Sequence, residues 1–147
     1  MTTVRHLLDQ KSAEIWSMRS ESSVREALRV MYERDIGVVV VVDGDQVSGI
    51  LSERDFARRM AVDTDFSLDT PVAELMTRAV VSVHPDQFMD DCMAIMTEKH
   101  IRHLPVLEGG RLVGLISIGD LVREIVSQKD VTIHSLENYI MGREFTA

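Results

Sequence analysis

The feature that most constrains this chain is a short pattern that occurs twice. Residues 47–56 read VSGILSERDF, and residues 112–121 read LVGLISIGDL. Each copy runs from an apolar, strand-like segment into Ser-x-x-Asp and then continues into a helical pattern. Ser52 and Ser117 are 65 residues apart, and the glycines and aspartates of the two copies have the same separation. The chain therefore carries the same strand-to-helix corner in each half.

The same separation relates residues well beyond these corners. Matching positions fall in predicted helix, strand and turn, which indicates an internal repeat. Each copy reads as β-α-β-β-α, and one copy is too small to cover its own sheet. We therefore predict an α/β (α+β) fold in which two such repeats pack with pseudo-two-fold symmetry. The matching pairs include Glu33 and Glu98, Ile36 and Ile101, Val41 and Val106, Gly44 and Gly109, and Arg58 and Arg123.

In the first half, Ser23 and Glu26 form a capping-box pattern at the start of a predicted helix. Five consecutive valines follow, which is typical of a strand buried on both faces of a sheet. The turn Asp43-Gly44-Asp45 then favours a hairpin. The predicted elements are a short strand at 15–18, a helix at 24–34, strands at 38–42 and 47–51, and a helix that Ser52 begins.

The second half predicts the same order of elements after a short helix at 72–76. Pro71 is expected at the first position of that short helix. We expect the longer helix to start at Asp86 and to turn Phe88 and Cys92 inward. The predicted strands cover 81–83, 103–107 and 112–116.

A polar, acidic connector over residues 61–70 is the only internal boundary that the composition indicates. We therefore divide the chain into a first repeat with its N-terminal segment, residues 1–66, and a second repeat, residues 67–130. The remaining residues, 131–147, have apolar side chains at helical spacing. They predict an additional amphipathic helix that needs a surface to cover.

Charge and cysteine content exclude several classes of function. The net charge of −8 argues against nonspecific binding to nucleic acid or to an acidic membrane surface. No apolar segment approaches the ~20 residues of a membrane span. The single cysteine, Cys92, permits no internal disulfide, which fits a reducing compartment. We expect a cytoplasmic protein.

Two tandem β-α-β-β-α units, each with hydrophobic-x-Gly-hydrophobic-hydrophobic-Ser-x-x-Asp, resemble the CBS domain pair, or Bateman module. The resemblance covers roughly residues 3–130, and the sequence HLPV at 103–106 is similar to the usual core strand of a second repeat. It is closest in kind to stand-alone bacterial CBS-pair proteins. The resemblance implies a non-enzymatic sensor that binds an adenine nucleotide in the clefts between its repeats. AMP is the first ligand it implies, with ATP, ADP, NAD and S-adenosylmethionine as alternatives. It also implies a homodimer and a regulated partner protein.

By this resemblance, Asp55 and Asp120 accept hydrogen bonds from ribose hydroxyls, while Ser52 and Ser117 bind phosphate or ribose oxygens. Without it, Ser followed three residues later by an acid is a helix-capping pattern, which is the commoner explanation for a single copy. The two roles are compatible. A strand that meets a helix N-terminus also presents backbone amides that suit a phosphate.

Basic residues near the corners are further candidates for phosphate binding. Arg54 and Arg58 follow the first corner, and for Arg58 a solvated helix face is the alternative. Arg102 and His103 lie at the head of the second buried strand, where a salt bridge at the sheet edge is the alternative. Arg54 in the first copy stands against Gly119 in the second, which predicts unequal ligand preference. The family geometry further implies apolar walls for adenine at Ile36, Val38, Val39, Val81, Val83 and Leu104.

Catalytic and metal-binding functions find little support in the sequence. His100 and His103 span the expected passage from helix to strand, so they would not share a face as metal ligands do. Cys92 lies on an apolar helix face, as a structural thiol does. The alternative to a sensor is a protein-protein interaction module whose clefts are degenerate and bind nothing.

Overall fold

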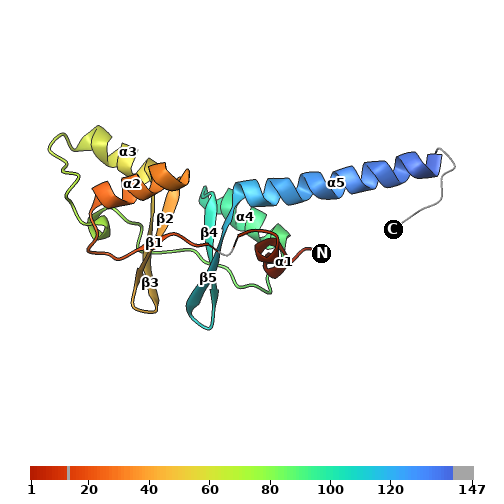
Figure 1. Cartoon of the computed structure of the whole chain (residues 1–147), viewed down its shortest axis with the longest axis horizontal. Helices are drawn as coiled ribbons and strands as arrows, with labels where there is room; N and C mark the ends of the chain where they lie inside the picture. Colours follow the sequence, from red (N-terminus) through yellow and green to blue (C-terminus); the bar gives the residue numbers. More distant parts are fainter. Residues whose placement is uncertain (13, 141–147) are drawn as a thin grey trace.

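The computed structural model describes residues 1–12 and 14–140 and shows two similar α/β units beside one another (Figure 1). Each unit contains a β-hairpin followed by a helix, and β3 and β5 bring the two hairpins together. The elements are α1 (Val4–Asp9), β1 (Ser17–Met18), α2 (Val24–Arg34), β2 (Val38–Asp43), β3 (Gln46–Ser52), α3 (Glu53–Val62), the 3-10 helix η1 (Val72–Glu74), α4 (Met89–Lys99), β4 (His103–Glu108), β5 (Arg111–Ser117) and α5 (Ile118–Ile140).

The hairpins form as predicted, because their turns and strands are specified locally. In β2 and β3, Val38 lies opposite Ser52, and in β4 and β5, His103 lies opposite Ser117. Both hairpins carry an irregularity in register at the same place in the repeat. Gly44 in the first turn has a φ of 60°, which glycine adopts without strain. The predicted mixed α/β fold of two repeats is confirmed.

The strand expected at 81–83 was predicted too long. In its place Val83 makes a single parallel bridge to Val106, and its N–H donates to the carbonyl of Pro105 at 3.0 Å. In the first unit, Val40 donates its N–H to Trp16 at 3.3 Å and so extends the pairing with β1. Pro105 occupies the place of Val40 in the repeat and has no N–H, so the ladder cannot continue.

The start of α4 also differs from the prediction. Phe88 precedes the helix in an extended conformation and is 39% exposed, because its backbone pairs with Thr3. Its N–H donates to the carboxylate of Asp91 at 3.3 Å. The helix therefore begins at Met89 rather than Asp86, and Phe88 does not point inward. Cys92 is fully buried, as expected.

The short helix before the second repeat was likewise predicted two residues too long. It is a 3-10 helix that covers only Val72–Glu74, and Pro71 precedes it as the capping residue. Val72 is fully buried nevertheless, so the segment still packs through its apolar face.

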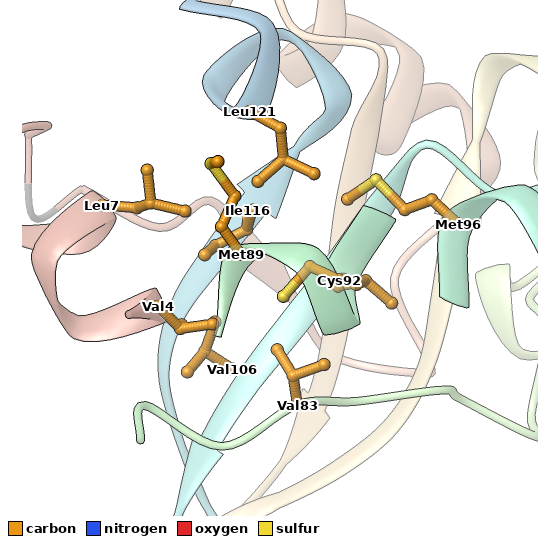
Figure 2. Close-up of a cluster of buried hydrophobic side chains, with 10 residues drawn as sticks. Val4, Leu7, Val83, Met89, Cys92, Met96, Val106, Ile116 and Leu121 are labelled. Carbon is orange, nitrogen blue, oxygen red and sulfur yellow. The ribbon is translucent and has the colours of Figure 1, made fainter. Parts of the chain in front are cut away.

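The segment that precedes each repeat packs against the other repeat. Val4 and Leu7 of α1 are buried in the core of the second unit (Figure 2), while Val72 and Met76 are buried in the core of the first. The proposed boundaries at 66/67 and 130/131 stay predictions, but α1 belongs by its packing to the second unit. The second core contains Val4, Leu7, Val83, Met89, Cys92, Met96, Leu104, Val106, Ile116 and Leu121.

The glycine of each repeated motif makes room for this exchanged packing. A Cβ atom at Gly114 would lie 2.4 Å from Cδ2 of Leu8, and one at Gly49 would lie 2.6 Å from Sδ of Met76. Both distances are far shorter than any real contact between such atoms. The motif thus needs glycine because a neighbouring segment lies directly on the strand.

Helix α5 is one continuous helix of 23 residues. The tail helix expected from residue 131 is therefore the continuation of the last helix of the second repeat, and residues 141–147 lie outside the described residues. Figure 1 shows α5 extending beyond the two units. None of the helices described in 1–12 and 14–140 combines the length and the apolar character needed to cross a membrane.

Candidate functional site

Both strand-to-helix corners have the capping geometry that the sequence predicts. At the first, the N–H of Asp55 donates to Oγ of Ser52 at 3.2 Å, and the N–H of Ser52 donates to Oδ2 of Asp55 at 2.9 Å. At the second, Asp120 and Ser117 exchange the same two bonds at 3.2 and 2.9 Å. These reciprocal bonds hold each carboxylate at the first turn of its helix.

The second carboxylate is held by more groups than the first. Asp120 is only 9% exposed, and Nζ of Lys11 lies 2.8 Å from its Oδ2. The same ammonium donates to the carbonyl of Leu115 at 2.9 Å, and Nη1 of Arg123 lies 3.2 Å from Oδ1. Burial acts to raise the pKa of Asp120, but hydrogen bonds from Lys11 and Ser117 outweigh it, so this pKa lies below its ordinary value. Asp120 is therefore ionised at neutral pH.

A cleft of about 640 Å³ opens beside this second corner. Its walls come from the N-terminal segment, from the approach to β2 in the first repeat, and from β4 and β5 in the second. This volume is typical of a site for a small organic ligand. Four residues predicted for the site line it, namely Ile36, Val38, His103 and Ser117.

Other residues predicted as adenine walls lie in the hydrophobic cores instead. Val39 and Leu104 are fully buried, and Val83 is 3% exposed. Alternate residues of a strand point to opposite faces, so Val38 faces the cleft while Val39 faces the helices. Val81 packs partly buried against the second core. These four residues support the sheet that carries the site.

The remaining predicted residues lie away from this cleft. Arg54 and Arg58 are exposed on α3, and Asp55 is half-buried at its start. Arg102 is exposed before β4, where its carbonyl accepts a hydrogen bond from Ile118 at 2.8 Å. Ser52, Arg54, Asp55 and Arg58 lie at the first corner, and none of them lines the 640 Å³ cleft.

The two corners are covered differently. At the first, Ile50 exchanges two backbone hydrogen bonds with Thr77, at 3.1 and 2.9 Å. At the second, the carbonyl of Leu115, at the place of Ile50 in the repeat, accepts a bond from the side chain of Lys11. The first corner is therefore contacted by backbone groups of Thr77, and the second corner by the side-chain ammonium of Lys11.

His103 adds a neutral polar group to the cleft. Burial is the main cause that lowers its pKa from the ordinary value, and the positive charges of Lys11 and Arg102 lower it further against the effect of Asp120. The imidazole is therefore uncharged at neutral pH. Such a group can donate or accept a hydrogen bond without adding charge to the cleft.

Sequence reasoning missed Lys11 and Trp16, which both line the cleft. Lys11 meets a carboxylate 109 residues away, so no local pattern could reveal it. Arg34 lies 4.1 Å from the centre of the Trp16 ring. Trp16 is the only tryptophan in the sequence, and this was the one signal that could have marked it as a candidate for the site.

The part of the chain that the structure describes offers neither a cluster of metal ligands nor a reactive thiol. There, no three His, Cys, Asp or Glu side chains gather in a way that could hold a metal ion. Burial raises the pKa of the Cys92 thiol to about 11, so this group stays protonated within the core.

Two related units, each with a β-hairpin that continues through an acidic corner into a helix, define a tandem module with a ligand-sized cleft beside its second corner. The family model described as the CBS domain matches residues 12–62 and 72–127. The chain belongs to the CBS domain family and carries the domain as a tandem pair, as the resemblance predicts.

Relatives and solved structures agree with this assignment. The chain is 34% identical to the mitochondrial CBS domain-containing protein CBSX3 of Arabidopsis thaliana, over 84% of this chain but only 62% of the relative. A putative signal-transduction protein with CBS domains from Burkholderia ambifaria is 46% identical, with a TM-score of 0.82 over 86% of this chain and 95% of that one. The CBS domain pair of MJ0100, solved with 5′-methylthioadenosine and S-adenosylmethionine, is 25% identical, with a TM-score of 0.76 over 87% and 98%.

Proposed function

We propose that this protein is a non-enzymatic sensor that binds an adenosine-containing ligand in the cleft beside Asp120. The observation that carries the proposal is the position of an ionised carboxylate at the head of α5, next to a cleft of ligand size. The MJ0100 pair, which shares the fold, is solved with two adenosine-containing ligands. AMP is the ligand we expect first, and ATP, ADP, NAD and S-adenosylmethionine are the alternatives.

In this proposal the carboxylate of Asp120 accepts hydrogen bonds from ribose hydroxyls. Its Oδ1 is bonded to the side chain of Arg123, which is 75% exposed and can turn into solvent when a ligand takes its place. Ser117 and His103 supply polar contacts near the same corner. Ile36 and Val38 form the apolar wall against which adenine packs.

We propose a second site at the first corner, where Asp55 takes the role of Asp120 and Ser52 that of Ser117. Arg54 and Arg58 are the phosphate partners of this site. Arg102, which directly precedes β4, is a further candidate phosphate partner. Because the neighbouring segment covers the two corners differently, we expect the sites to differ in ligand preference.

Signalling follows from the composition of the cleft. Its walls come from both repeats and from the N-terminal segment, so a ligand that contacts all three stabilises one relative position of these parts. A regulated partner protein would respond to that shift through its preference for one of the two positions.

We also propose that the active form is a homodimer in which α5 pairs with α5 of a second copy. Its exposed apolar residues, together with Lys129, recur in alternating steps of four and three, which is the heptad pattern of a coiled coil. β-branched residues occupy one set of positions and leucine contributes to the other, a combination that favours two strands. The stripe contains Val122, Val126, Ile133, Leu136 and Ile140, each more than half exposed, with Lys129 between them.

Calorimetric titration with AMP, ADP, ATP, NAD and S-adenosylmethionine tests the binding site. We expect Asp120→Ala to weaken binding by about 10- to 100-fold, since a hydrogen bond to a charged group contributes about 1.5–3 kcal/mol. Asp65→Ala, at an exposed position in the connector, is the matched control and should bind as the wild type does. If no adenosine compound binds, or if Asp120→Ala and Asp55→Ala both leave binding intact, the proposal fails.

A further inference from the structure

Lys11 lies between the cleft and the carboxylate of Asp120. Lys11 lines the cleft, whereas Asp120 is 9% exposed and is not among the lining residues. The ammonium donates one N–H to Asp120 at 2.8 Å and another to Leu115 at 2.9 Å. A lysine ammonium has three N–H groups, so one remains for a ligand. A ligand that enters the cleft therefore meets a cation before it meets the carboxylate.

The charges around the cleft make this cation important. The acidic residues that line it outnumber the basic ones, and Arg5 is already bound to Glu108 at 2.8 Å and to Asp86 at 3.3 Å. His103 is uncharged at neutral pH, because burial lowers its pKa. Among the residues that line the cleft, Lys11 is therefore the cation best placed to compensate the charge of an anionic group. The acidic lining residues are Asp9, Glu14, Asp35 and Glu108.

Lys11 is a feature of the second corner alone, because the matching position at the first corner holds a different residue. The residue 65 positions after Lys11 is Met76, which is 7% exposed in the core of the first unit. Lys11 itself follows α1, which Val4 and Leu7 anchor in the second core. The fold thus holds a lysine at one corner and an apolar side chain at the matching position of the other.

We propose that Lys11 is the specificity-determining residue of this cleft, and that it selects adenosine ligands with an anionic phosphate group over neutral adenosine. The inference rests on the proposed function and adds the class of ligand. The ammonium neutralises Asp120, which reduces the repulsion between this carboxylate and a bound phosphate. Its third N–H donates to a phosphate oxygen, a charge-assisted bond that a neutral ligand cannot form.

The test compares AMP with adenosine on the same preparation of each variant. In the wild type we expect AMP to bind at least about 10-fold tighter than adenosine, which is the factor expected for one charge-assisted hydrogen bond. Lys11→Met, the residue that the repeat places at the matching position, should reduce this ratio to within about 2-fold. Lys11→Arg should retain most of it, because the positive charge remains.

The ratio of the two affinities is insensitive to the fraction of folded protein, and Lys11→Gln provides a second neutral variant if Lys11→Met does not fold. Raising the salt concentration should weaken AMP binding in the wild type and leave adenosine binding nearly unchanged. Binding of both ligands with an unchanged ratio in the neutral variants would overturn the role of Lys11 alone. Failure of the wild type to bind AMP, adenosine and every other adenosine compound of the calorimetric panel would overturn the proposed function as well.

Discussion

Replacement of Gly114 by alanine tests the contact that holds α1 against β5. The added Cβ would lie 2.4 Å from Cδ2, 2.9 Å from Cδ1 and 3.2 Å from Cγ of Leu8. Carbon atoms in contact are normally about 3.5–4.0 Å apart, so Leu8 must move by about 1 Å. The Leu8 side chain is half-buried, and Val4 and Leu7 on the same short helix are buried, so a shift of Leu8 strains the packing of α1. The substitution should therefore displace α1 and, with it, the segment after α1 that holds Lys11 beside Asp120.

The expected cost is that of an overpacked core. Such insertions reduce the free energy of unfolding by about 1–3 kcal/mol. For a chain of this size, each kcal/mol lowers the melting temperature by about 2–4 °C. Gly119→Ala is the matched control, because the nearest atom to its added Cβ is Oγ of Ser117 at an ordinary 3.5 Å. We expect that control to leave stability unchanged or to raise it by up to about 1 kcal/mol, since alanine favours helix.

Urea denaturation of a double-mutant cycle with Leu8→Ala measures the contact itself. Once the Leu8 side chain is truncated, the methyl group at residue 114 has room. Gly114→Ala should then cost less than about 0.5 kcal/mol in the Leu8→Ala background. An equal cost in both backgrounds, or a single variant as stable as the wild type, would show that Leu8 does not require glycine at this position.

Three further predictions concern other parts of the molecule. Because Cys92 is fully buried and its pKa is raised to about 11, native protein should react with an aromatic disulfide reagent at least about 100-fold more slowly than unfolded protein, and rapid native labelling would contradict this. The lowered pKa of His103 means that the folded state favours the neutral imidazole, so the free energy of unfolding should fall as pH falls below 6.5. That fall should be smaller in His103→Gln, and an NMR titration midpoint at or above 6.5 would refute it. Leu136→Glu, on the exposed stripe of α5, should convert a dimer to a monomer in sedimentation without loss of helical circular dichroism, and a dimer that persists would exclude the α5 contact.

The parts of the fold that the sequence could predict are those specified by neighbouring residues. The valine run, the glycine turns and the Ser23 cap each depend on residues a few positions apart. The valine strand and the turns occur as predicted, and of the predicted capping box the bond from the N–H of Glu26 to Oγ of Ser23 is present at 3.2 Å. The prediction of a strand at 81–83 was wrong, although the sequence contained the reason. Pro105 lacks the N–H that would extend the pairing with this segment. The predicted start of α4 was wrong because the backbone of Phe88 pairs with Thr3, a contact that no local pattern reveals.

The site divides in the same way. Ser117 and Asp120 could be predicted because the motif is local and occurs twice. Strand alternation could also have separated Val38, which lines the cleft, from the buried Val39. Lys11 could not be predicted, because its place depends on the packing of α1 against the distant repeat.

That packing has a consequence for how the chain can be divided. A break in the connector between α3 and η1 would separate Val4 and Leu7 from the core they fill, and Val72 and Met76 from theirs. Neither fragment would be a self-sufficient folding unit, yet each would carry the piece that the other lacks. The two halves would behave as complementary subunits of a heterodimer.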